Sequence, residues 1–428
     1  MRKCVLAAVI AAKTAFPQSP PKLTLKDATA LALKNHPQIL AAENDVAYAN
    51  QQTLENRSAY YPTVDAEITG SVANHGSRIG AGYLTDSRLF NRFGDGITMS
   101  QLITDAGRTP NLVASARLNA QASSQTYQAT RYSVLLQVNR AYYDALHARA
   151  VVKVAEETVA ARQLLYDQVS ALAKNKLKSD LDASFADVNV AEARLLLLRA
   201  QDVLESAEAE LSRALGSDQV LHYELVDEPL PSSPPVEADD LVAQAMSNRP
   251  ELAGLRYSSE AAYKFAEAEK DLARPTISLV GTAGYIPYIA QLTSQTIPSE
   301  YGAAAVNVQI PVFNGHLFSA RREAAHYRAL AADQRLRDEQ ERIARDVRVA
   351  WASAATAFQR IDVTAQYLRH ASLALELAQG RYQLGLSSIV ELTQAQLSLT
   401  QAEIENLSAK YDYQSQYATL QFAIGLLR

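Results

Sequence analysis

The stretch Arg381-Tyr382-Gln383-Leu384-Gly385-Leu386-Ser387-Ser388 interrupts a very long helical pattern that runs from about residue 320 to residue 427. Before this break, apolar or small residues recur in alternating steps of four and three, which is the seam of a coiled coil. The seam residues are Ile343, Val347, Ala350, Ala354, Ala357, Ile361, Thr364, Leu368, Ala371, Leu375, Ala378 and Tyr382. A helix over 319–383 would extend roughly 100 Å, too long for an ordinary globular core. The pattern therefore predicts a long helix that lies against other long helices.

The composition argues against several classes of protein. The chain has 428 residues, a net charge of −5 and no dense block of Lys and Arg, so nucleic acid is not an expected partner. Its one cysteine, Cys4, allows no internal disulfide, and no His/Cys cluster suggests a metal site. No Gly-rich phosphate loop follows a strand, and no Ser/His/Asp signature appears. We therefore expect no enzyme activity, no metal and no cofactor.

The N-terminus resembles an export signal. Residues 1–15 begin with Arg2 and Lys3 and continue with an apolar run, although Lys13 shortens that run. This order predicts a secretory signal sequence, and an ordinary N-terminus is the alternative. Elsewhere no run approaches the roughly 18 apolar residues of a membrane-spanning helix. A membrane crossing, if there is one, is therefore expected to use strands.

The chain repeats itself. Pro37 and Pro250 each follow a short amphipathic helix, and their offset of 213 residues (250 − 37) recurs for the prolines at 62 and 275. The coiled-coil seam that starts at Val134 matches the one that starts at Ile343 with an offset of 209 (343 − 134). These matches predict two structural repeats, 23–216 and 237–425, joined by a Pro-rich linker at 217–236.

Both repeats follow one plan. Each has a short helix, a helix of medium length, a β hairpin (about 63–104 and 276–313), a long helix (about 108–174 and 319–383), a tight break and a return helix (about 181–215 and 389–424). The return helices carry a seam of their own, which in the first repeat is Val188, Ala191, Leu195 and Leu198. Long and return helices are therefore predicted to form antiparallel pairs.

The β segments indicate a membrane. Between Pro275 and Ser319 the only formally charged side chain is Glu300, in a chain that is one-fifth charged. Strands of about ten residues with one apolar and one polar face are typical of a transmembrane barrel, and two hairpins in a soluble sandwich are the alternative. Since four strands cannot close a barrel, the membrane hypothesis requires an oligomer. A trimer would give a 12-stranded barrel and 12 helical strands for a continuous tube.

The order and spacing of these features resemble the TolC-like outer membrane efflux protein family over nearly the whole chain. The resemblance rests on the two-fold repeat, the Phe313-Asn314-Gly315 entry to the second long helix and the Arg381-Tyr382-x-x-Gly385-x-Ser387 break. It implies a mainly α fold with a small β part, a homotrimer in the bacterial outer membrane and an α-helical tunnel in the periplasm. The implied function is a passive exit duct, fed by an inner-membrane pump through a periplasmic adaptor. The alternative is a soluble or peripheral coiled-coil scaffold.

The resemblance also implies which residues act at the break and at its first-repeat twin. The gate or constriction falls on Glu391, Gln394, Asp182 and Tyr382, and the adaptor-docking tips fall on Leu384, Gly385, Leu386, Ser387, Leu177, Lys178 and Ser179. For Glu391 and Asp182, stabilisation by the helix dipole is the alternative explanation. Lys176 stands where the family usually has glycine, so a left-handed backbone there would be strained and a differently shaped first tip is expected.

Overall fold

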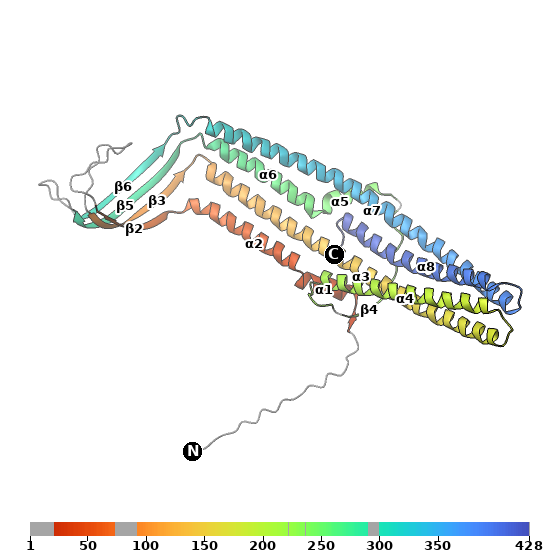
Figure 1. Ribbon diagram of the computed structural model, residues 1–428. Coiled ribbons are helices and arrows are strands. Elements are labelled where there is room, and N and C mark those ends of the chain that lie inside the picture. Colours follow the sequence, from red (N-terminus) through yellow and green to blue (C-terminus); the bar gives the residue numbers. More distant parts are fainter. Residues whose placement is uncertain (1–20, 73–91, 221, 236, 290–298, 428) are drawn as a thin grey trace, which may run out of the picture. The chain divides into compact units, whose positions relative to one another are not determined.

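The computed structural model describes residues 21–72, 92–220, 222–235, 237–289 and 299–427 (Figure 1). The predicted signal sequence at 1–15 lies outside these residues. The chain divides into two compact units. Of the described residues, we call the unit that contains 21–41, 129–249 and 342–427 the helical unit. The other, Ala42–Gln128 and Pro250–Glu341, is the sheet unit.

Two 67-residue helices, α3 (Arg108–Lys174) and α7 (Leu317–Gln383), contribute to both units. The helical unit also holds β1 (Lys22–Leu23), α1 (Leu25–Asn35), α4 (Asp180–Ala214), β4 (Glu224–Leu225), α5 (Asp239–Asn248) and α8 (Ile389–Ala423). The sheet unit holds most of α2 (Pro37–Arg57) and all of η1 (Ser58–Tyr60), β2 (Thr63–Ser71), β3 (Arg92–Thr104), α6 (Pro250–Asp271), β5 (Thr276–Ile289) and β6 (Glu300–Gln309). The chain is thus mainly helical with a small β part, as the sequence predicts.

The core of the helical unit is the predicted seam of the long helices. In α3 the residues Val134, Val138 and Ala145 are fully buried, and in α7 Val347 and Ala354 are too. Because most seam positions are Ala or Val, the helix axes can approach closely. The four-and-three spacing in the sequence therefore identified the buried face correctly.

The return helix α4 buries a different face from the one predicted. The predicted seam residues Val188, Leu195 and Leu198 are each more than half exposed, whereas Ala193 and Ala200 are buried against the unit. Both stripes have coiled-coil spacing, so spacing alone does not distinguish them, and the prediction that the larger side chains form the core is wrong. The structure places the small residues inside because close helix packing favours them.

A glycine in the left-handed conformation follows the end of each return helix. Gly216 follows α4 with φ +80° and Gly425 follows α8 with φ +74°, a left-handed conformation that closes a helix at little cost only for glycine. A Cβ at Gly216 would lie 3.0 Å from the backbone of Asn35, and one at Gly425 would lie 2.9 Å from Cβ of Asn248. The two repeats thus dock the end of the return helix on the end of the short helix by the same close approach.

The linker is bound to the helices through its backbone carbonyls. The Tyr142 hydroxyl donates to Val226 O at 2.6 Å, and Trp351 Nε1 donates to Pro235 O at 2.8 Å. These two aromatic residues occupy equivalent positions in the repeats, since they differ by the seam offset of 209 (351 − 142). Gln414 Nε2 adds a bond to Glu228 O at 2.9 Å. The linker is therefore fixed along the helical unit.

The sheet has four antiparallel strands in the order β2-β3-β5-β6 (Figure 1). Each hairpin comes from one repeat, and the β3–β5 pairing joins them. Strand β6 ends at Gln309, short of the predicted end at 313, because Pro311 has no backbone N–H for pairing. Among the described helices, none is long and apolar enough to cross a membrane.

Candidate functional site

The turn between α7 and α8 is a compact helix cap followed at once by a new helix. Leu386 N donates to Arg381 O at 2.8 Å and Gly385 N donates to Tyr382 O at 3.1 Å, which is the hydrogen-bond pattern of a Schellman motif. Gly385 takes the left-handed position with φ +72°. The two bonds fix the turn and direct the following residues into α8.

The turn between α3 and α4 has the same backbone geometry. Leu177 N donates to Leu172 O and Lys176 N to Ala173 O, both at 2.9 Å, and Lys176 has φ +56°. The expectation that lysine would give this tip a different shape is therefore wrong. The hydrogen bonds hold Lys176 in the left-handed region, at a cost of about 1 kcal/mol relative to an unstrained residue.

Serine begins both return helices. The Ser179 hydroxyl accepts a bond from Leu181 N at 3.1 Å, and the Ser388 hydroxyl accepts one from Glu391 N at 3.4 Å. This capping places Asp182 and Glu391 in the first turns of α4 and α8, where the helix dipole stabilises a carboxylate. The two predicted acidic residues therefore occupy equivalent places in the two hairpins.

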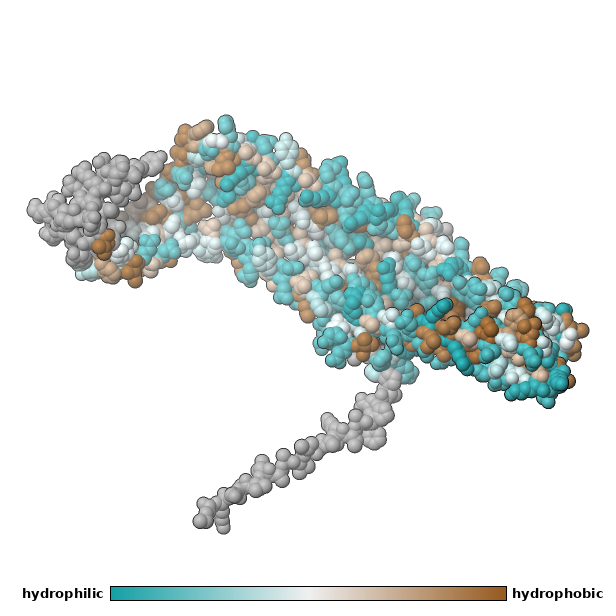
Figure 2. Space-filling view, viewed as in Figure 1, coloured by the Kyte–Doolittle hydropathy of each residue, from teal (hydrophilic) through white to brown (hydrophobic). Residues whose placement is uncertain are grey.

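The tips expose apolar side chains. Leu384 is 76% exposed, Leu386 65% and Leu177 70%, although each belongs to a well-formed turn. Figure 2 shows hydrophobic residues gathered over this end of the helical hairpins. Ser179 is exposed as well, whereas Lys178 and Ser387 are half-buried. Exposed leucines at a turn contribute little to the fold of one chain, so the tips have the character of a contact surface.

Tyr382 lies inside rather than on the surface of the tips. It is 7% exposed and belongs to a cluster with Val169 of α3 and Leu392 of α8, so it joins the two hairpins. Lys178 Nζ lies 4.1 Å from the centre of its ring, a cation–π contact from the first tip to the second. Burial, followed by the charge of Asp182, raises the pKa of Tyr382. Its hydroxyl has no hydrogen-bond partner among the described residues.

The predicted constriction residues differ in their surroundings. Glu391 is about half exposed and pairs with Arg381, whose Nε lies 3.1 Å from Glu391 Oε1. Gln394 is exposed, and Asp182 is half-buried. The structure thus brings Tyr382 and Lys178 together across the hairpins and gives Glu391 a cation as its nearest charged neighbour.

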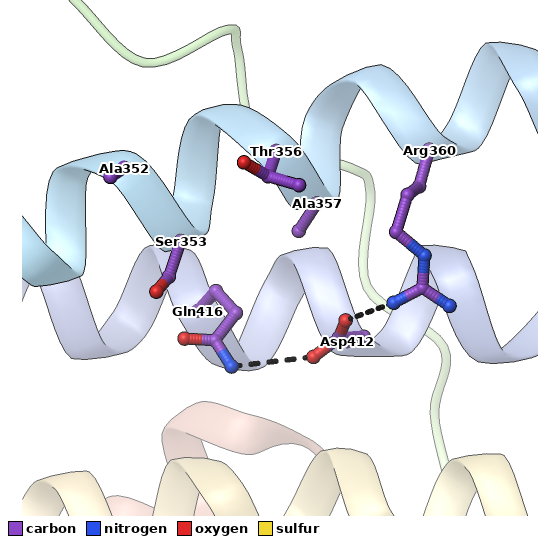
Figure 3. A pocket seen from close by; sticks show the side chains of 7 residues that line it. All are labelled: Ala352, Ser353, Thr356, Ala357, Arg360, Asp412 and Gln416. Carbon is purple, nitrogen blue, oxygen red and sulfur yellow. Dashed lines mark hydrogen bonds and ion pairs between the residues drawn. The ribbon is translucent and has the colours of Figure 1, made fainter.

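A groove between α7 and α8 lies elsewhere in the helical unit (Figure 3). Its floor is made of small side chains, among them Ala352 and Ser353. At one side Arg360 donates to Asp412 at 2.9 Å, and Gln416 donates to the same carboxylate at 3.3 Å. The polar groups at this side therefore pair with one another. The groove is a shallow gap between two packed helices.

One face of the sheet is apolar and open to the outside. The register places Ala66, Ile97 and Ala283 in one row, and the same face carries Val64 and Val306 in other rows. The exposed fractions are 60% for Val64, 54% for Ile97 and 68% for Val306. Such a continuous exposed apolar face needs a nonpolar environment or another protein to cover it.

The opposite face of the sheet is polar. The row that contains Thr98 also contains Asp65 and Thr282, and the next row contains Glu67. Among the side chains that the structure describes, the apolar face carries charge only at its rim, where Asp95 and Glu300 share the row that ends the β5–β6 pairing. A sheet apolar on one side and polar on the other separates a hydrocarbon layer from an aqueous space.

Known proteins match the chain along nearly its whole length. The model of the outer membrane efflux protein family matches residues 29–217 and 241–426. The chain belongs to this family. Its two matched segments overlap closely with the repeats 23–216 and 237–425 of this efflux protein. The scaffold alternative is therefore set aside, and the chain is assigned to the outer membrane.

Individual relatives of this efflux protein agree with that assignment. The outer membrane efflux protein BepC of Brucella suis biovar 1 (strain 1330) is 24% identical over 423 residues, 96% of this chain and 87% of that protein. The outer membrane protein TolC of Vibrio cholerae serotype O1 is 25% identical over 92% of this chain and 89% of its own length. The crystal structure of the Campylobacter jejuni CmeC outer membrane channel superposes with a TM-score of 0.82, at 18% identity over 94% of this chain and 85% of that one. The fold is thus that of the family's channels.

Sequence reasoning overlooked two contacts of this efflux protein. The sequence predicts no role for Arg381, because its partner Glu391 stands ten residues further on and only the turn brings them together. The contact of Lys178 with Tyr382 joins the two repeats, and no sequence spacing indicates it. The first contact could have been found by testing which charges a two-helix turn makes adjacent.

Proposed function

We propose that three copies of this chain form an exit duct in the outer membrane, which passively conducts substrates delivered by an inner-membrane pump through a periplasmic adaptor. Membership of the outer membrane efflux protein family supports the location and the class of function. The trimer, the adaptor contact and the gate rest on the arguments that follow.

The two-faced sheet is the observation that carries this proposal. Its apolar face is exposed at Val64, Ile97 and Val306, and its outer strands β2 and β6 leave their free edges unpaired within the described chain. An unpaired edge is costly in lipid, because no water is present to bond the backbone groups. Further copies that join edge to edge would satisfy β2 and β6, and three copies would supply 12 strands.

The exposed stripe of α4 supports an oligomer as well. Val188, Leu195 and Leu198 lie on one side of the helix and are 53–62% exposed. Apolar residues with coiled-coil spacing normally face another helix. A second copy of the chain is the occupant that the proposed trimer provides for this stripe.

The tips are proposed to serve as the periplasmic end of the duct. Leu384, Leu386 and Leu177 offer apolar contacts to an adaptor, and Glu391 and Asp182 are the proposed charges of the constriction. Tyr382 is proposed to hold the closed form, because it is buried between the hairpins and lies beneath Lys178 of the other tip. Specificity for cargo would then reside in the pump.

The proposal is tested by a charge placed on either face of the sheet. Ile97→Lys would put a lysine on the apolar face, and we expect a loss of about 2–4 kcal/mol in the free energy of unfolding from lipid vesicles. Thr98→Lys is the matched control, since the adjacent residue on the same strand points to the polar face and should change this energy by less than about 1 kcal/mol. Urea titration of the vesicle-bound protein measures both.

Two results would contradict the proposal. Equal costs for the two lysines would mean that the face containing Ile97 does not contact lipid. Purified wild-type protein that opens no pores in a planar bilayer would argue against a duct.

A further inference from the structure

Arg381 spans the turn between α7 and α8. Its Nε donates to Glu391 Oε1 at 3.1 Å, and its Nη2 donates to the carbonyl oxygen of Leu386 at 3.4 Å. The side chains of Arg381 and Glu391 are 55% and 47% exposed, so the pair can be reached by water and ions. One guanidinium therefore contacts both the turn and the carboxylate that follows it.

Glu391 has turned toward this arginine rather than back to its own helix end. Ser388 and Glu391 have the spacing of a capping box, in which the glutamate side chain bonds the backbone N–H of the serine. The serine half of that arrangement is present, because the Ser388 hydroxyl accepts from Glu391 N at 3.4 Å. The carboxylate of Glu391 instead binds Arg381.

The first tip lacks this arginine. The seam offset of 209 aligns Glu391 with Asp182 (391 − 209) and Arg381 with Leu172 (381 − 209). Asp182 makes no ion pair within 4 Å among the described residues, and its charge contributes to the raised pKa of Tyr382. Lys178 of the same tip lies over the Tyr382 ring.

We propose that Arg381 sets the ion selectivity of the constriction by neutralising Glu391, so that Asp180 and Asp182 in the first turn of α4 are the acidic charges of the tips that have no ion pair among the described residues. This inference rests on the proposed trimeric duct. It does not require a strong ion pair, because arginine keeps its charge at any physiological pH and adds one positive charge per copy beside each carboxylate. A ring of three Glu391 would then be accompanied by a ring of three Arg381, and the two would cancel.

The test is the reversal potential of purified channels in a planar bilayer under a KCl gradient. Measurements belong at or below about 0.1 M salt, where the screening length is about 10 Å or more. Arg381→Gln should raise the cation-to-anion permeability ratio by about threefold or more, because it leaves the Glu391 ring unbalanced. Glu391→Gln should lower the ratio, and the double variant should return to the wild-type value.

Two further variants separate charge from shape. Arg381→Lys keeps the charge but lacks the planar guanidinium, so the wild-type ratio is expected. Leu172→Arg adds the missing cation to the first tip and should lower the ratio by compensating Asp182.

Channels of normal conductance whose ratio is the same for wild type and Arg381→Gln would overturn the inference. A cation-selective wild type that loses its selectivity in Glu391→Gln, with no change in Arg381→Gln, would also overturn it. Wild-type protein that forms no channel would instead refute the proposed function, so the two failures are distinguishable.

Discussion

The first tip provides a direct test of backbone strain at Lys176. Its φ of +56° differs by 16° (72 − 56) from the φ of +72° of Gly385 at the second tip. Both residues occupy the same place in a Schellman motif. Replacing Lys176 by glycine removes the repulsion between Cβ and the backbone that a left-handed residue experiences, and it leaves both hydrogen bonds of the turn in place. The substitution is therefore expected to stabilise the tip.

The magnitude follows from two opposing terms. A left-handed residue with a Cβ costs roughly 1–2 kcal/mol, whereas glycine loses about 0.5–1 kcal/mol more backbone entropy when it is fixed. Lys176→Gly is then expected to stabilise the closed tip by about 0.5–1 kcal/mol. An amide hydrogen that exchanges only when the tip opens locally should therefore exchange about two to five times more slowly. The amide to follow is that of Leu177, which is bonded to Leu172 O at 2.9 Å.

Hydrogen exchange followed by mass spectrometry on a peptide that covers 172–180 measures this change. Lys176→Ala is the control, because it removes the charge and keeps the Cβ, so its exchange should stay near that of the wild type. Gly385→Ala is the converse variant. A Cβ at Gly385 meets no atom within 4 Å, so only the backbone conformation opposes it, and the Leu386 amide should exchange faster. The reasoning is refuted if Lys176→Gly exchanges as fast as Lys176→Ala.

Two further predictions concern the other glycines and the tip surface. Gly425→Ala should lower the free energy of unfolding by about 2–4 kcal/mol, which is more than Gly385→Ala should. The alanine Cβ would lie 2.9 Å from Asn248, and the residue would also have to keep the strained φ of +74°. Equal losses of the two variants in chemical denaturation would contradict the close approach. Leu386→Asp should abolish cross-linking of the tips to an adaptor in intact cells and leave the level of trimer in the membrane unchanged. Gln383→Asp adds the same charge three residues earlier and should retain the cross-linking. Full cross-linking of Leu386→Asp would exclude docking through the connection between α7 and α8.

Much of the fold could be predicted because its signals are periodic and local. The four-and-three spacing before Tyr382 identified the buried face of α7, and the offset of 209 between the repeats located the first helical hairpin once the second was known. The alternation around Ile97 and Val306 indicated a sheet with one apolar face, which the strand register confirms. Each of these patterns follows from the helix or strand period and needs no knowledge of distant neighbours.

The candidate site was less predictable, because its contacts depend on the turn and on the second repeat. For α4 the sequence predicts a buried seam of large residues around Leu195, whereas the structure buries Ala193. The predicted strain at Lys176 was sound, but the two hydrogen bonds of the turn hold the left-handed conformation despite it. The constriction and docking roles of the tips remain predictions.

The sequence by itself determined the two repeats, the long helical hairpins, the two-faced strands and the positions of both breaks, since each depends on residue spacing along one element. Only the tertiary structure decided what the charges at the breaks face. Arg381 meets Glu391 because a Schellman turn reverses the chain between them, and Lys178 meets Tyr382 because the two hairpins pack together at their ends. Electrostatic interactions depend on distance in space, and a sequence fixes that distance only within a single helix or strand.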